Sequence, residues 1–238
     1  MDSTNRLAAE LARSGAADGT VVGAEHQTAG RGRQGRTWES EPGSSLLASV
    51  ILRPAPPLVS LAAGLAAARA CESVAGVSAT LKWPNDVMVA EGKLGGILSE
   101  LVREPGSLGE AVVVGLGLNV HWRSPLPLGG AALGPGVDRA DLLVAWLTAL
   151  DDPCDVLAGY RARCSTIGRR VRVELAGETV EGMVEGVDDD GSLLVEGRKI
   201  VAGDVVHLRS PPAARGQPVV RDRGRGPREP RTHWPLRG

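Results

Sequence analysis

The amino-acid sequence predicts an α+β protein with a mainly antiparallel or mixed sheet, followed by a small all-β unit. Helical and strand periodicities are interspersed over the first part of the chain. At residues 169–209 the pattern changes to short strands separated by glycine turns, which is typical of a small β-barrel of the SH3 kind. Residues 210–238 are rich in Arg and Pro and almost lack aliphatic residues, which predicts a disordered tail. We therefore expect a larger domain at 1–168, the barrel at 169–209 and the tail at 210–238.

The elements of the larger domain follow from its apolar periods and its breakers. Ser3 or Thr4 can cap a first helix, which Gly15 and Gly19 end. A tight turn at Glu91-Gly92 joins two strands. The expected elements are a helix over 5–17, strands over 20–27 and 46–52, a helix over 58–74, a strand over 79–83, two strands within 87–102, a strand over 111–120, and helices over 138–150 and 155–163.

The small unit has four expected strands with dipeptide turns between them. The turns are Ala176-Gly177, Asp190-Gly191 and Glu196-Gly197. The strands are expected over 171–175, 178–187, 191–196 and 199–209.

Composition excludes several classes of protein. The formal net charge is −1, which does not favour a general nucleic-acid binder. The three cysteines include no C-x-x-C pair, which indicates reduced thiols without a zinc site. The sequence has no signal-peptide pattern and no apolar run of about 18 residues, the length that a membrane span needs. We therefore expect a cytoplasmic protein that does not enter a membrane.

The stretch GRGRQGRTW at residues 30–38 is a basic, glycine-rich loop. Gly30, Gly32 and Gly35 match the dinucleotide-binding pattern G-x-G-x-x-G. No helical periodicity follows the loop, however, and its variable positions hold Arg31 and Arg33 rather than small residues. The stretch is better interpreted as an arginine clamp for a carboxylate or a phosphate. The alternative is a solvated basic loop.

Three further stretches in the larger domain carry candidate binding groups. KWPND at 82–86 presents Lys82, Asn85 and Asp86, a carboxylate suited to Mg²⁺, unless the stretch is only a capped turn. GKLGGIL at 92–98 places Lys93 beside two glycines, and the alternative is a plain strand bulge. GLGLN at 115–119 has a glycine floor that ends at Asn119, and the alternative is a sheet with small residues under a helix. Together with the arginine clamp, the three stretches describe a site for a nucleotide and a carboxylate.

These motifs occur in the order found in biotin–protein ligases. DSTN at 2–5, Gln27, GRGRQGRTW, KWPND, GKLGGIL and GLGLN all fit, and the sequence resembles that family over residues 2–209. The resemblance implies a class II aminoacyl-tRNA synthetase/biotin ligase-like catalytic domain with a C-terminal SH3-like β-barrel. It also implies a two-step reaction. Biotin and MgATP give biotinyl-5′-AMP and pyrophosphate, and biotin then passes to one lysine of a biotin carboxyl carrier domain while AMP leaves.

The resemblance also implies roles for individual residues. Lys93, Arg31 and Arg33 would be catalytic, with Lys93 contacting the biotin carboxylate and the reacting phosphate. Asp86 would hold Mg²⁺. The residues implied in biotin binding are Ser3, Thr4, Asn5, Gln27, Gly30, Arg31, Gly32, Arg33, Lys93, Gly95, Gly96, Gly115 and Gly117. Those implied in ATP binding are Arg33, Arg36, Trp38, Lys82, Asn85 and Asn119.

The implied partner is the biotin carboxyl carrier protein or domain of an acyl-CoA or pyruvate carboxylase. A homodimer is left open. No helix-turn-helix pattern precedes DSTN, so we expect no specific DNA binding. Two alternatives remain: a lipoate–protein ligase, which shares the fold and the adenylate chemistry, and a non-catalytic homologue that binds an anion or an adenylate.

Overall fold

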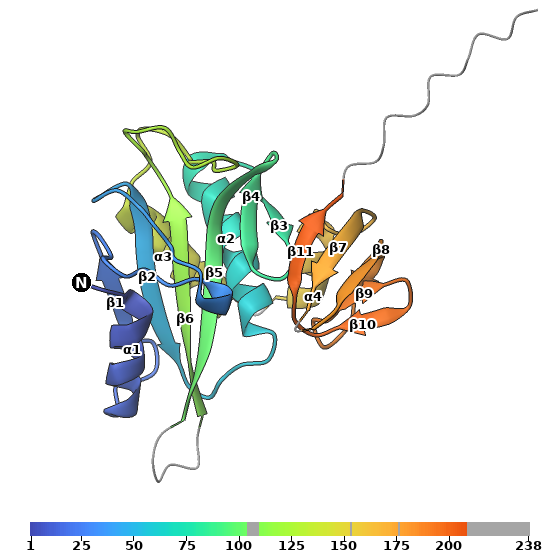
Figure 1. Cartoon of the computed structure of the whole chain (residues 1–238). Helices are drawn as coiled ribbons and strands as arrows, with labels where there is room; N and C mark the ends of the chain where they lie inside the picture. Colours follow the sequence, from blue (N-terminus) through green and yellow to red (C-terminus); the bar gives the residue numbers. More distant parts are fainter. Residues whose placement is uncertain (104–109, 153, 176, 209–238) are drawn as a thin grey trace, which may run out of the picture. The chain divides into compact units, whose positions relative to one another are not determined.

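The larger sheet has six strands in the order β1-β2-β6-β5-β4-β3 (Figure 1). The computed structural model describes residues 1–103, 110–152, 154–175 and 177–208. Every pair of neighbouring strands is antiparallel, which confirms the expected α+β class with a mainly antiparallel sheet. The strands are β1 (Val21–Ala24), β2 (Ser45–Leu52), β3 (Thr80–Lys82), β4 (Asp86–Val89), β5 (Gly92–Arg103) and β6 (Glu110–Asn119).

Helices cover both faces of this sheet. Successive residues of a strand point to opposite faces, so Val50 packs in the core under α2 and α3, whereas its neighbour Ile51 packs against α1. Val112 and Val113 on β6 divide in the same way. The helices are α1 (Thr4–Arg13), α2 (Val59–Ala75), α3 (Arg139–Asp151) and α4 (Val156–Arg163).

The C-terminal sheet has five strands in the order β10-β9-β8-β7-β11, again all antiparallel. The turn between β9 and β10 has positive φ angles at both Glu196 and Gly197, as a tight hairpin turn requires. Among the described residues β10 and β11 do not pair, so a closed barrel is not observed. The strands are β7 (Arg170–Glu174), β8 (Thr179–Val187), β9 (Leu193–Val195), β10 (Arg198–Ile200) and β11 (Asp204–His207).

Three sequence predictions need correction. The strand expected over 199–209 is two strands, because the chain leaves β10 and crosses to the far edge of the sheet to pair with β7. At the crossing, a Cβ on Gly203 would lie 2.6 Å from Val173 Cγ1, so only glycine fits there. The first helix ends at Arg13 and not at residue 17, and the left-handed Gly15 follows it. The first strand is limited to Val21–Ala24.

The structure does not divide the described chain at the predicted domain boundary. Residues Met1–Leu208 cluster as one compact unit, and a division at 168/169 stays a prediction. The expected tail at 210–238 lies outside the described residues. None of the helices in the described part of the chain is both long and apolar enough to cross a membrane.

Candidate active site

A cavity of about 380 Å³ lies where the predicted motifs meet. Its walls come from the start of α1, the basic loop, the β3–β4 hairpin, the cavity-facing part of β5, β6 and strand β11. The structure thus brings together side chains that are far apart in the sequence. The predicted site residues that line the cavity are Ser3, Thr4, Asn5, Gln27, Arg31, Gly32, Arg33, Arg36, Trp38, Lys82, Asn85, Asp86, Lys93, Gly96, Gly115 and Gly117.

Lys93 faces the cavity because of a bulge at the start of β5. Met88 pairs with Lys93 and Val87 pairs with Gly95, so Leu94 is an extra residue that is buried in the core. The Lys93 ammonium lies 2.7 Å from Asp86 Oδ1 and 5.9 Å from the centroid of the Trp38 ring. The predicted catalytic lysine and the predicted metal-binding carboxylate therefore form an ion pair in this structure.

The KWPND stretch forms a hairpin in which Lys82 and Asp86 are paired residues. Asn85 fixes its turn to β5, since its Nδ2 donates to the carbonyl of Ile97 at 2.9 Å and its own carbonyl accepts from the Ile97 N–H. Burial lowers the pKa of Lys82, the Asp86 carboxylate offsets part of this effect, and the neighbouring Lys93 lowers the pKa further. Lys82 therefore releases a proton more readily than an exposed lysine does.

The basic loop is folded back on itself. Arg31 and Thr37 form an isolated antiparallel bridge, and the Gly32 N–H donates to the Arg36 carbonyl at 2.7 Å. A Cβ on Gly30 would lie 2.2 Å from the Trp38 carbonyl oxygen, so glycine is required where the two ends of the loop meet. Gly30 closes the loop and is not among the residues that line the cavity.

Each arginine of the loop has a polar partner. Arg31 lies 3.0 Å from Glu100, Arg33 donates to Asn85 Oδ1 at 3.3 Å, and Arg36 forms an ion pair with Asp204. Burial lowers the pKa of Arg33. The loop is thus attached to β5, to the KWPND hairpin and to the C-terminal sheet.

The opposite end of the cavity is neutral and polar. Gln27 Oε1 accepts hydrogen bonds from the backbone N–H and the hydroxyl of Thr4, at 2.7 and 3.1 Å. The buried Asn5 side chain accepts from Ser49 at 2.7 Å and donates to Glu100 at 2.9 Å. Neutral donors and acceptors of this kind suit a ligand with an uncharged polar ring.

The glycines of β6 are covered by side chains. A Cβ on Gly115 would lie 2.0 Å from Asn5 Oδ1, and a Cβ on Gly117 would lie 2.7 Å from the Trp38 ring. Gly95 faces the core, where a Cβ would lie 2.7 Å from Leu118 Cδ1, and it does not line the cavity. The structure therefore gives Gly95 a packing reason to be glycine.

Asn119 lines a second cavity of about 300 Å³, which shares Trp38 and Lys93 with the first. Its Nδ2 donates to the Ala131 carbonyl, and its Oδ1 accepts from the indole N–H of Trp122 at 3.2 Å. The buried indole N–H of Trp38, by contrast, has no hydrogen-bond partner within the described chain. Thr37, Trp38 and Lys93 line both cavities.

Sequence reasoning missed several residues of the site. Glu174 and Asp204 of the C-terminal sheet line the cavity, and no local pattern marked them. Ser49 and Glu100 bind the side chain of Asn5. Glu100 carries no distinct local signal, because its strand also holds Lys93, Ser99 and Arg103.

The donor set for a metal ion is small. The described residues contain no cluster of three or more His, Cys, Asp or Glu side chains that could hold a metal. Asp86 is one carboxylate at the cavity wall, with its Oδ1 on Lys93. One carboxylate fits Mg²⁺ that arrives with a nucleotide, because phosphates and water supply the other ligands of such an ion.

Comparison with known proteins agrees with this geometry. Residues 1–119 match the model of the biotin/lipoate A/B protein ligase family, and residues 166–208 match the biotin protein ligase C terminal domain. The biotin–[acetyl-CoA-carboxylase] ligase of Mycobacterium tuberculosis is 43% identical, over 87% of this chain and 86% of that protein. The bifunctional ligase/repressor BirA of Bacillus subtilis is 32% identical, over 86% of this chain and 71% of that protein.

A solved structure supports the same assignment. The biotin protein ligase from Aquifex aeolicus in complex with biotin and ATP superposes with a TM-score of 0.73 at 27% identity, covering 88% of this chain and 96% of that chain. The two family models cover residues 1–119 and 166–208, and the relatives and the solved structure cover 86–88% of the chain. The chain belongs to the biotin protein ligases of the biotin/lipoate A/B protein ligase family.

Proposed function

We propose that this chain activates biotin with MgATP and transfers it to a lysine of a biotin carboxyl carrier domain. One observation carries the proposal: a single cavity joins a neutral polar end to a cationic end. The neutral end, with Thr4, Asn5 and Gln27, suits the ureido ring of biotin. The cationic end, with Arg33 and Lys93, suits a carboxylate beside a phosphate.

In the first half-reaction a carboxylate oxygen of biotin attacks the α-phosphorus of ATP. The bond between the α-phosphorus and the bridging oxygen breaks, and pyrophosphate leaves with the electron pair. Two anions must approach each other, so the main work of the protein is electrostatic. Lys93, Arg31 and Arg33 line the same cavity and are the groups that we propose to offset this repulsion.

In the second half-reaction the amine of the carrier lysine attacks the acyl carbon of biotinyl-5′-AMP. The bond from this carbon to the phosphate oxygen breaks, AMP leaves, and the new amide forms after the nitrogen loses a proton. The cavity offers two groups that could accept the proton: Lys82, whose pKa burial lowers, and the carboxylate of Asp86.

The remaining assignments follow from the same chemistry. Arg36, Trp38, Lys82, Asn85 and Asn119 are proposed to bind ATP, and they line the two connected cavities. Asp86 is proposed to hold the Mg²⁺ that ATP brings, which would neutralise phosphate charge. An SH3-like barrel for the C-terminal sheet, a carboxylase carrier domain as partner and a cytoplasmic location are also part of the proposal.

The two alternatives are less well supported. A lipoate-specific site would place apolar side chains where Thr4, Asn5 and Gln27 form a buried polar network. A non-catalytic homologue would have no need for Lys93 and Asp86 to be paired at 2.7 Å inside the cavity.

Pyrophosphate release tests the proposal. The purified chain should release pyrophosphate from MgATP with biotin and not with lipoate. Lys93→Ala should lower the rate by about 10²- to 10³-fold, the usual loss for one group that stabilises a transition state electrostatically. Lys199→Ala is the matched control, because this lysine pairs with Asp188 and Asp190 and does not line the cavity.

Three results would change the assignment. Release with lipoate alone would keep the fold and overturn the substrate. A rate that Lys93→Ala leaves unchanged would remove this lysine from catalysis. If the folded chain releases no pyrophosphate with either biotin or lipoate, the proposed ligase activity is wrong.

A further inference from the structure

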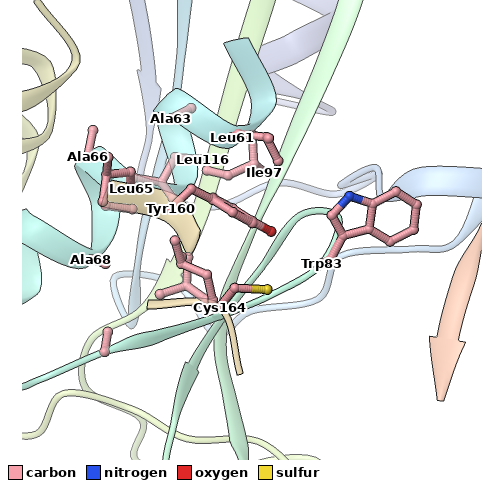
Figure 2. Close-up of a cluster of buried hydrophobic side chains, with 14 of the residues drawn as sticks. Leu61, Ala63, Leu65, Ala66, Ala68, Trp83, Ile97, Leu116, Tyr160 and Cys164 are labelled. Atoms are coloured by element: carbon pink, nitrogen blue, oxygen red, sulfur yellow. The ribbon is translucent and has the colours of Figure 1, made fainter. Parts of the chain in front are cut away.

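Trp83, the second residue of KWPND, is bound at both ends by the C-terminal part of the chain. Its backbone N–H donates to Thr166 Oγ1 at 3.1 Å, and its indole N–H donates to the Gly191 carbonyl at 2.9 Å. The side chain is buried and belongs to the same hydrophobic cluster as Leu61 and Ile97 (Figure 2). Gly191 lies in the turn between β8 and β9. Trp83 thus joins the KWPND hairpin to the C-terminal part of the chain, in addition to the hydrogen bonds between Leu81 of β3 and Ser165.

The hydroxyl of Thr166 lies between Trp83 and His207 and links the two residues. It is fully buried, and its hydroxyl lies 3.2 Å from His207 Nε2 on β11. Burial lowers the pKa of His207 to about 4, so the imidazole is neutral at neutral pH and its Nε2 can accept a proton. The Thr166 hydroxyl can then donate to His207 while it accepts from Trp83. Both hydrogen-bonding functions of the hydroxyl are used.

The turn of the hairpin is consequently held from two sides. Asn85, its last residue, is fixed to Ile97 on β5 by two hydrogen bonds. Trp83, its first residue, is fixed to Thr166 and Gly191. The turn connects Lys82 to Asp86, so both anchors bear on the direction in which these two side chains face.

We propose that Thr166 is a positioning residue for the first half-reaction, through which the C-terminal sheet holds the Trp83–Asn85 turn and directs Lys82 and Asp86 toward the nucleotide. The inference rests on the proposed function. Thr166 itself does not line the cavity. Its influence should fall on ATP rather than on biotin, because the neutral end of the cavity is built from α1 and Gln27 and not from the hairpin.

The test uses biotin-dependent exchange of pyrophosphate into ATP, which requires no carrier protein. Thr166→Val keeps the shape of the side chain and removes the hydroxyl, which leaves the buried Trp83 N–H without its partner. We expect kcat/KM for ATP to fall by about tenfold or more and KM for biotin to change less than about twofold. Thr166→Ser restores the hydroxyl and should return kcat/KM for ATP to within about threefold of the original.

A control separates positioning from general destabilisation. Val195 is a buried residue of β9, and Val195→Ala should weaken the C-terminal sheet without touching Trp83. This variant should keep its kinetic constants for ATP. If Val195→Ala lowers kcat/KM for ATP as much as Thr166→Val does, or if Thr166→Val lowers the values for both substrates equally, the positioning role is refuted.

A structural measurement keeps the inference apart from the proposed function. Amide hydrogen exchange of residues 82–86 should be faster in Thr166→Val than in the original chain, and unchanged in Val195→Ala. Unchanged exchange in Thr166→Val would refute the connection even if the enzyme is a biotin ligase. Suppose instead that amide hydrogen exchange is faster in Thr166→Val but that the original chain does not incorporate pyrophosphate into ATP. This result would refute the proposed function and leave the connection in place.

Discussion

Replacing Gly115 with alanine tests how the neutral end of the cavity is built. The new methyl group would lie 2.0 Å from Oδ1 and 2.9 Å from Cγ of Asn5, which is far inside van der Waals contact. Asn5 cannot shift without loss, because it is buried and hydrogen-bonded to Ser49, Leu98 and Glu100. Gly115→Ala should therefore displace the Asn5 side chain and break a buried polar network.

The cost follows from the bonds that are lost. Each hydrogen bond contributes about 0.5–1.5 kcal/mol net. Displacing Asn5 breaks its three hydrogen bonds, to Ser49, Leu98 and Glu100, which together contribute about 1.5–4.5 kcal/mol. We expect the free energy of unfolding to fall by about 2–4 kcal/mol, which lowers Tm by about 5–15 °C for a chain of this length.

Urea denaturation followed by tryptophan fluorescence measures the free energy of unfolding. Gly186→Ala is the matched control, because a Cβ at this β-strand glycine would meet no atom within 4 Å. The decisive comparison is a double-mutant cycle with Asn5→Ala, which removes the clashing side chain. In that background Gly115→Ala should cost less than about 1 kcal/mol, a coupling of at least about 1–2 kcal/mol. Equal costs in both backgrounds would show that Asn5 is not the reason for the glycine.

Three other features give measurable outcomes. Burial lowers the pKa of His207 from 6.5 to about 4 in the folded chain, so between these pH values the unfolded state binds more protons than the folded state. The free energy of unfolding should therefore fall as the pH drops from 6.5 to 4. His207→Gln should make the urea midpoint less dependent on pH over this range. Asp204→Asn releases Arg36 from its ion pair, so KM for ATP should fall by up to about fivefold, whereas Arg36→Gln should raise it; a rise in both variants would contradict competition for Arg36. Burial raises the pKa of Cys71 to about 12, while Cys154 is the most exposed of the three thiols, so iodoacetamide should label the native chain at Cys154 first and all three thiols only after unfolding.

The sequence predicted the parts of the fold that local patterns determine. Apolar period and turn residues located the strands 46–52 and 111–120 and the long helix within a residue or two of β2, β6 and α2. The end of the first helix was misplaced because the alanines at 16 and 17 prolong a helical pattern that the left-handed Gly15 has already ended. The crossing at Gly203 was missed because the pairing of β11 with β7 and the close approach to Val173 both involve another strand.

In the site, too, local sequence indicated which residues take part, whereas their contacts depend on residues far away in the sequence. Motif residues such as Lys93 and Asp86 could be grouped from the sequence, because their chemistry is unusual for their local surroundings. Their pairing at 2.7 Å could not, since it depends on the bulge at Leu94 and on the register between β4 and β5. The contribution of Asp204 depends on a contact with Arg36 across 168 positions in the sequence, and no local signal marks it.

Three cations that line the cavity are paired with carboxylates of the protein. Lys93 pairs with Asp86, Arg31 with Glu100, and Arg36 with Asp204. A substrate anion therefore exchanges one carboxylate for another ligand and does not simply neutralise an isolated charge. Because these pairs are partly exposed to solvent, each is worth about 0–1 kcal/mol, so the exchange costs little. The pairing also reduces the repulsion among these cationic side chains, and it lets a loop that carries three arginines keep a defined fold.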